Sequence, residues 1–187
     1  MITPYSLHNQ DFSDKAHLLA QTEVYPDFFG VARDRLEFSV LPEHERNYLD
    51  WSQGIDRVVQ VKGYKGNIPL TFQERFRAKK FAKHHDATIT TWNHISNMQG
   101  ELYKLRAQYF LYGYFDIETG RFAEVVIFNV ATFLRSHIRQ TMHYTKDFNA
   151  RSQQTFMSVK FEHLAAIGAL DYHRKWGTSP YREQKAE

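Results

Sequence analysis

Short runs of apolar and β-branched residues recur along the chain in patterns that are typical of strands. Two of these runs, 54–61 and 70–77, flank a turn segment rich in Gly, Asn and Pro, and together they predict a hairpin. Further runs predict strands over 36–41, 87–92, 122–130 and 155–161. The run over 122–130 is almost continuously apolar, which indicates a strand that is covered on both faces.

Apolar residues at helical spacing separate these strands. They predict helices over 14–25, 99–112, 131–139 and 162–170. The aromatic run over 109–115 is interpreted as core packing at the end of the second helix, with stacking against nucleic-acid bases as the less favoured alternative. From Tyr172 onward the sequence becomes polar and predicts an irregular C-terminal segment.

Helices that alternate with strands predict an α/β fold with a central mixed sheet flanked by helices on both faces. We expect this sheet to contain 55–61, 69–77, 87–92 and 122–129. The 187-residue chain has no internal repeat and no linker rich enough to divide it. It therefore predicts a single α/β domain over 1–175, followed by a flexible tail over 176–187.

Composition restricts the chemistry. The chain contains no Cys, which excludes disulfides, thiolate zinc sites and cysteine nucleophiles. No apolar run approaches the ~20 residues that cross a bilayer, and the first residues lack the pattern of a secretory signal. These features predict a cytoplasmic protein without a membrane partner. The formal net charge of +3 is compatible with a nucleic-acid partner but does not require one.

Each arm of the predicted hairpin carries a carboxylate among apolar neighbours, Asp56 on the first arm and Glu74 on the second. An acidic group in a sheet interior is costly unless a cation or a hydrogen-bond partner stabilises it. Two such groups on neighbouring strands, beside several arginines, predict a metal or phosphate site. Edge-strand carboxylates that face water or pair with Arg75 and Arg77 are an equally weighted alternative.

This arrangement resembles the restriction-endonuclease-like, or PD-(D/E)XK, superfamily of nucleases, over about residues 21–113. Glu23 resembles the glutamate that the first helix of that family often carries. The segment 54–56 (Gly-Ile-Asp) resembles the strand with the first aspartate, and 72–75 (Phe-Gln-Glu-Arg) resembles the next motif strand. The segment 96–109 is similar to the helix that follows the two strands.

The resemblance implies a restriction-endonuclease-like fold and hydrolysis of the phosphodiester bonds of nucleic acid, with DNA as the expected substrate. It implies Mg²⁺ (or Mn²⁺), because this chemistry needs an activated water and neutralisation of charge on the phosphate. The residues that the resemblance assigns to the metal are Asp56, Glu74 and Glu23. Those that it assigns to catalysis are Asp56, Glu74, Arg75 and Lys104.

The chain departs from the family at the motif lysine, because Arg75 stands two residues after Gln73 and Phe76 stands two residues after Glu74. Strand alternation places Gln73 and Arg75 on one face and Glu74 on the other. Three alternatives therefore stay open. The motif is Gln-x-Arg, or Glu74 is the ligand and Lys104 of the following segment supplies the cation, or the fold is kept without catalysis.

Two further groups of charged residues near the predicted hairpin could contribute to the site. Glu101 and Lys104, one helical turn apart, fit a role at the site or a simple ion pair equally well. A run of basic residues begins at Arg75, and its place directly after a carboxylate-bearing strand suits a phosphate backbone, although a solvated loop is the plainer interpretation. The nucleic-acid-binding candidates are Gln73, Arg77, Lys79, Lys80 and Lys83.

The adjacent His84, His85 and Asp86 do not favour a zinc site, because neighbouring histidines point apart and no further ligand has suitable spacing. The sequence thus favours a metal-dependent nuclease. The alternative is a non-catalytic nucleic-acid-binding or interaction protein on the same fold. A homodimer is compatible with either function, and the sequence does not decide between DNA and RNA.

Overall fold

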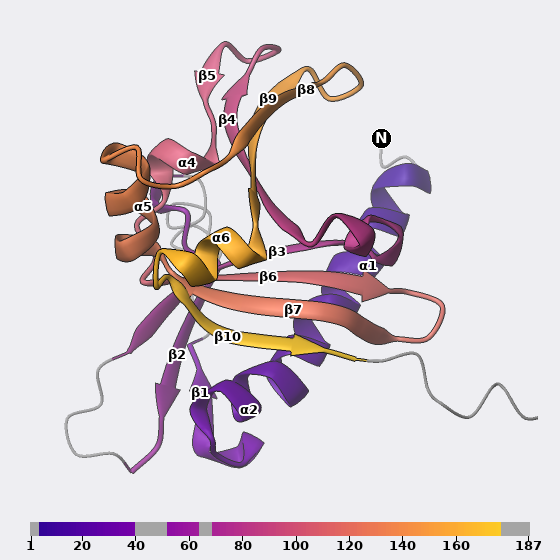
Figure 1. The fold of residues 1–187 in the computed structure, drawn as a ribbon. Helices are drawn as coiled ribbons and strands as arrows, with labels where there is room; N and C mark the ends of the chain where they lie inside the picture. The colour runs from indigo at the N-terminus through magenta and orange to yellow at the C-terminus, as the bar shows by residue number, and fades with distance from the viewer. Residues whose placement is uncertain (1–3, 40–51, 64–68, 177–187) are drawn as a thin grey trace, which may run out of the picture.

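The structure is a computed structural model that describes residues 4–39, 52–63 and 69–176. Its strands form two sheets, which meet at a steep angle (Figure 1). The larger sheet has the order β1-β2-β3-β6-β7-β10. Its strands are β1 (Leu36–Phe38), β2 (Arg57–Val61), β3 (Leu70–Ala78), β6 (Tyr109–Asp116), β7 (Arg121–Asn129) and β10 (Leu170–Lys175).

This larger sheet is mixed. β3 and β6 run parallel, whereas the other neighbouring pairs run antiparallel. The smaller sheet is antiparallel and has the order β5-β4-β9-β8. Its strands are β4 (Asp86–Asn93), β5 (Met98–Gln99), β8 (Thr145–Asn149) and β9 (Gln154–Lys160).

Helical segments begin the chain and fill the connections. The N-terminal helix α1 (Pro4–Leu19) continues through a π-helical turn η1 (Ala20–Val24) into α2 (Tyr25–Phe29). The other segments are short: the 3₁₀ turns η2 (Arg33–Arg35) and η3 (Lys79–His84), and the helices α4 (Glu101–Lys104), α5 (Val130–Ile138) and α6 (Phe161–Ala166). None of the helices in the described segments is long and apolar enough to cross a membrane.

The two faces of the larger sheet pack on different partners. On one face, Leu111 and Ile127 join α1 and η1 in an apolar cluster that includes Ala16 and Ala20. On the other face, Phe110, Tyr112, Tyr114, Val126 and Phe128 pack against apolar side chains of the smaller sheet and of α4, α5 and α6. The alternation along β6 and β7 therefore supplies both cores, as expected for strands covered on both sides.

The structure confirms an α/β fold with a central mixed sheet, and it confirms the 57–61/70–78 hairpin as an antiparallel pair. Strands at 121–129 and 154–160 and a helix at 130–138 also lie where the sequence predicts them. Of the predicted strand over 36–41, residues 36–38 form β1, while 40 and 41 lie outside the described residues.

Several predictions are wrong. The segment 87–92 is a strand, but it belongs to the smaller sheet rather than to the central one, so that a second sheet shares one face with the helices. The predicted helix over 99–112 is a single turn at 101–104 followed by the central strand β6. Residues 170–175, partly assigned to an irregular C-terminal segment, form β10 against β7. Residues 177–187 lie outside the described part of the chain.

Candidate functional site

The hairpin brings Asp56 and Gln73 together. Its register pairs Arg57 with Phe72, so that Asp56, just before β2, lies opposite Gln73 on β3. Asp56 Oδ2 accepts hydrogen bonds from Gln73 Nε2 at 2.6 Å and from the backbone N–H of Glu74 at 2.8 Å. These two hydrogen bonds to a carboxylate are charge-assisted, and they fix Asp56 against β3. The two segments that resemble the motif strands, 54–56 and 72–75, are therefore in direct contact.

Glu74 does not share this environment. Its side chain is fully buried on the opposite face of β3, against α1 and α2. One oxygen, Oε2, lies 2.5 Å from His17 Nδ1 and 3.3 Å from the Arg57 guanidinium. The other, Oε1, accepts a 2.5 Å hydrogen bond from the Tyr25 hydroxyl. The structure therefore places Glu74 in a closed network and brings only its backbone to Asp56.

The electrostatics of this network suit an ionised carboxylate. Burial by itself would raise the pKa of Glu74, but the hydrogen bond and charge of His17, the Arg57 guanidinium and the Tyr25 hydroxyl lower the pKa below its ordinary value. Burial and the neighbouring Glu74 charge raise the pKa of Tyr25 well above its ordinary value, so its hydroxyl stays protonated and donates. The network holds α1 and α2 onto the hairpin.

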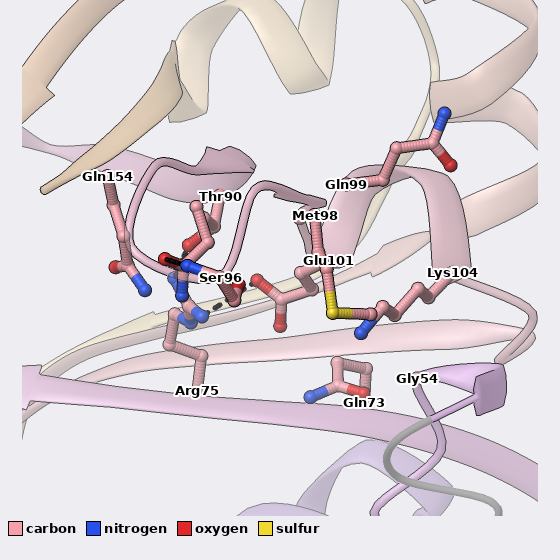
Figure 2. Close-up of a pocket in the computed structure, with 12 residues that line it drawn as sticks. Gly54, Gln73, Arg75, Thr90, Ser96, Met98, Gln99, Glu101, Lys104 and Gln154 are labelled. Atoms are coloured by element: carbon pink, nitrogen blue, oxygen red, sulfur yellow. Dashed lines mark hydrogen bonds and ion pairs between the residues drawn. The ribbon is translucent and has the colours of Figure 1, made fainter.

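On the other face of β3 lies a hollow of about 400 Å³, which we call the Lys104 pocket (Figure 2). Gln73 and Arg75 form its floor, and α4 supplies Glu101 and Lys104 from one side. Figure 2 shows the side chains of Arg75, Glu101 and Lys104 directed into the same space above Gln73. The remaining lining residues are Gly54, Thr90, Asn93, Ser96, Met98, Gln99, Gly100 and Gln154.

Arg75 is held inside this pocket by three groups. Its guanidinium lies 2.9 Å from Glu101 Oε2. It also donates to the Thr88 carbonyl at 3.3 Å and to the Thr90 hydroxyl at 3.4 Å. The charge of this half-buried arginine is therefore balanced by a carboxylate. Its guanidinium extends from β3 of the larger sheet to β4 of the smaller one. Its planar fork can bind phosphate, but it does not act as a base in proteins.

The position of α4 depends on Gly100, its N-terminal cap residue. The backbone N–H of Gly100 donates to the Thr91 carbonyl at 2.9 Å, which ties α4 to β4. A Cβ at residue 100 would lie 2.4 Å from the Thr90 carbonyl oxygen, a backbone atom that cannot move aside locally. Only glycine therefore permits α4 to lie this close to β4 and to present Glu101 and Lys104.

We expect Gly100→Ala to lower the free energy of unfolding by about 1–3 kcal/mol, the usual range for overpacking a tight contact. Displacement of α4 should also lower the affinity of the Lys104 pocket for its ligand. Chemical denaturation followed by circular dichroism measures the first effect. Ile95→Ala, at a residue that is 75% exposed in the turn between β4 and β5, is the control and should be neutral. Equal stability of the two variants would contradict the close approach.

The donor set of the pocket is compatible with a hard divalent cation. Because Gln73 Nε2 donates to Asp56, the orientation of the amide is fixed, and Oε1 must point the other way. That oxygen is buried and has no hydrogen-bond partner among the described residues. An unsatisfied buried acceptor is costly, so a cation or a water is expected there. Gln73 and Glu101, which line the pocket, and Asp56, which is hydrogen-bonded to Gln73, are of the carboxylate and amide oxygen type that Mg²⁺ uses.

This set shares only Asp56 with the one that the sequence predicts, which is Asp56, Glu74 and Glu23. Within residues 4–39, 52–63 and 69–176, no three His, Asp or Glu side chains are grouped so that they could hold a metal ion together. Glu23 is exposed and lines a shallow hollow beside Asp27 and Arg174, not the Lys104 pocket. The structure therefore joins Asp56 to Gln73 and Arg75 to Glu101, but it does not bring Glu23 or the Glu74 carboxylate to them.

The basic run divides among several surfaces. Arg77 lines a second hollow, described below, and Lys79 forms a 2.8 Å ion pair with Asp116. Lys80 lies at a separate hollow next to α1, and Lys83 is exposed in η3. The five nucleic-acid-binding candidates therefore do not form one continuous patch, because Gln73, Arg77 and Lys80 line three different hollows.

Sequence reasoning missed the partners that complete the site. His17, Tyr25 and Arg57 surround Glu74, and Thr90 with Gly100 shape the Lys104 pocket. The contacts of Glu74 join residues that are 17 to 57 positions apart. Those of the Lys104 pocket involve β4 of the smaller sheet. A possible signal was the buried Glu74 itself, because a carboxylate on a covered strand requires donors on the element that packs against it.

No protein-family model, curated protein or solved structure matches the chain.

Proposed function

We propose that the protein is a metal-dependent nuclease that hydrolyses phosphodiester bonds of nucleic acid at the Lys104 pocket, on a restriction-endonuclease-like fold. One observation carries the proposal. Gln73, Arg75, Glu101 and Lys104 come from two distant segments and line one hollow, and Asp56 is hydrogen-bonded to Gln73. The resemblance implies an aspartate on one strand and, on the next, a Gln or acidic residue two positions before a lysine; here Arg75 stands at that lysine position, and Lys104 is the candidate to replace it.

The oxygen donors Asp56, Gln73 and Glu101 would hold Mg²⁺ or Mn²⁺. A bound divalent cation would lower the pKa of a water and neutralise charge on the phosphate. Asp56 would contribute its carboxylate, which is held in place by Gln73 and by the backbone of β3. Gln73 contributes an amide oxygen whose direction is fixed by its bond to Asp56.

The two cations of the pocket have different roles in this proposal. Lys104 carries three flexible N–H donors and can hold the attacking water or the leaving oxygen in place. Arg75 carries a rigid fork that binds two phosphate oxygens, and its pairing with Glu101 keeps that fork within the pocket. A substrate phosphate would compete with Glu101 for Arg75 and so release this carboxylate for the metal.

One observation favours the second candidate function, a non-catalytic nucleic-acid-binding protein. The residue two positions after Gln73 is Arg75 rather than lysine, and it is already neutralised by Glu101 at 2.9 Å. An arginine at this position can bind phosphate but cannot act as a base, so a cleft with Arg75 in place of the lysine could bind nucleic acid without cleaving it. Metal-dependent turnover is therefore the property that separates the two functions.

Separate substitutions of the two cations test the assignment. Lys104→Ala should lower kcat by about 100-fold with little change in KM, at the lower end of the range for a positioned acid–base or orienting group. Arg75→Ala should chiefly raise KM, since it removes phosphate binding. The measurement is steady-state cleavage of a fluorescent oligonucleotide with Mg²⁺.

Lys15→Ala, which removes an exposed lysine of α1, is the matched control and should leave both constants unchanged. The assignment fails if Lys104→Ala cleaves at the wild-type rate. It also fails if the two substitutions change kcat and KM in the same proportion, because the roles of Lys104 and Arg75 would then not differ.

A further inference from the structure

A second hollow of about 630 Å³, which we call the Arg77 pocket, is lined by residues of the same two strands, β3 and β4, as the Lys104 pocket. Arg75 lines the first pocket and Arg77 the second, on the same face of the strand. On β4, Thr90 lines the first and Thr88 the second. Residues two apart on a strand are about 7 Å apart, which is close to the distance between successive phosphates of one nucleic-acid strand.

Arg77 presents a positive charge to this pocket. Its guanidinium lies over the Phe81 ring, 4.2 Å from the centroid, and its hydrogen-bond contact is a long 3.5 Å approach to the Thr88 hydroxyl. In the segments that the structure describes, no carboxylate forms an ion pair with Arg77, in contrast to Arg75 and Glu101. The stacked guanidinium is therefore directed toward the hollow and available to an anionic ligand.

The walls of the pocket are aromatic. Three half-buried aromatic residues line it: Phe81 from η3, Tyr144 just before β8, and Phe156 from β9. An arginine beside several aromatic rings is the combination that binds a nucleotide, with the phosphate on the cation and the base against the rings. An apolar ligand would not use the arginine, and a simple anion would not use the rings.

Two carboxylates also line this pocket, and among the described residues neither forms an ion pair with Arg77. Asp86 is buried, and its oxygens accept hydrogen bonds from the Tyr114 hydroxyl at 2.7 Å and from the Ser158 hydroxyl. It is therefore engaged with the wall. Asp147 is exposed on β8, at the rim. Lys160 adds a second cation, whose ammonium donates to the His84 carbonyl at 2.5 Å.

We propose that the Arg77 pocket binds one unpaired nucleotide of a single nucleic-acid strand, next to the phosphate that occupies the Lys104 pocket. The inference rests on the proposed function for the position of that neighbouring phosphate. A base inside a duplex is stacked and paired, so it cannot enter a hollow between two sheets unless it is flipped out. The protein should therefore bind single-stranded or locally unpaired nucleic acid in preference to a continuous duplex.

Fluorescence anisotropy in EDTA tests this without cleavage. The probes are a labelled single-stranded DNA of about 12 nucleotides, the same sequence as RNA, and the DNA duplex; a single fold occupies roughly 4–16 nucleotides in such proteins. We expect wild-type protein to bind one or both single strands at least ~10-fold more tightly than the duplex. Equal or tighter binding of the duplex would overturn the proposal.

Two substitutions locate the binding. Arg77→Ala and Phe156→Leu should each weaken single-strand binding by about 10-fold, since one removes the phosphate contact and the other removes the flat ring face. Lys62→Ala, an exposed cation at the far end of β2, should bind as wild type. Circular dichroism and thermal melting establish that each variant is folded.

If folded Arg77→Ala and Phe156→Leu bind the single strands as wild type does, the nucleotide is not in this pocket and the proposal fails. The binding experiment contains no metal, so its outcome is independent of cleavage. If the protein binds single strands through Arg77 but never cleaves, this inference stands and the proposed nuclease function fails. If it cleaves but binds duplex more tightly, the nuclease function stands and this inference fails.

Discussion

Asp56→Asn should abolish Mg²⁺-dependent cleavage, with a fall in kcat of ~10³-fold or more, because it removes the charged ligand from the proposed metal site. Asparagine has nearly the shape of aspartate, and its side-chain oxygen can still accept from Gln73 Nε2 and from the backbone N–H of Glu74. The substitution therefore removes charge while it keeps the local hydrogen bonds. The measurement is single-turnover cleavage of a labelled oligonucleotide.

The matched control is Asp34→Asn, an exposed acid in η2 on the far side of the hairpin, which should cleave at the wild-type rate. Denaturation curves of Asp56→Asn should remain cooperative, so that loss of activity is not loss of fold. Cleavage by Asp56→Asn within tenfold of wild type would remove Asp56 from the site.

Glu74→Ala should lower the free energy of unfolding by about 3–5 kcal/mol, the usual effect of removing one member of a buried charge pair. The substitution leaves the Arg57 guanidinium, the Tyr25 hydroxyl and His17 Nδ1 without their shared acceptor. The same three groups join α1 and α2 to the hairpin, so the loss should spread to the packing of the N-terminal helices. Urea denaturation followed by circular dichroism measures it.

Glu162→Ala, whose side chain is 80% exposed on α6, is the control and should change stability by less than about 0.5 kcal/mol. The folded-state pKa of Glu74 lies below its ordinary value of 4.5, so its contribution is fully present above that pH and is lost as the pH falls through the folded-state pKa. Wild-type protein should therefore lose stability below about pH 4.5 more steeply than Glu74→Ala. Glu74→Ala that loses less than 1 kcal/mol would contradict the buried network.

The elements that local pattern determines were predicted correctly from the sequence. The hairpin, β7 and α5 carry apolar periodicity that their own residues produce. The face assignment of β3 was also correct, because strand alternation alone places Gln73 and Arg75 opposite Glu74. What failed depends on packing between distant segments. The assignment of β4 to a second sheet is set by its pairing with β9, some 70 residues later.

The segment 99–112 shows how two periodicities compete. Its apolar residues fit helical spacing, but the run from Tyr109 to Phe115 is also apolar at almost every position, as in a strand covered on both faces. The structure places this run between β3 and β7, where both of its faces are covered, so the run forms a strand rather than a helix. Lys104 consequently lies in a single helical turn beside the pocket rather than on a long helix.

The candidate site was predicted in part for the same reason. Asp56, Gln73 and Arg75 lie on one hairpin, so sequence spacing could bring them together. Glu101 depends on the close approach of α4 to β4 at Gly100, which no local pattern reveals. Glu23 was assigned to the metal through the family resemblance, but it lines a different hollow, beside Asp27 and Arg174.

The measurement that tests the central claim most directly is cleavage of labelled single-stranded and double-stranded DNA and RNA by the purified wild-type protein, with Mg²⁺, with Mn²⁺ and with EDTA. A metal-dependent nuclease at the Lys104 pocket should cleave at least one substrate with either metal and none in EDTA, and Asp56→Asn should remove that activity. The absence of cleavage of all four substrates in both metals would contradict it, as would cleavage that persists in EDTA or in Asp56→Asn.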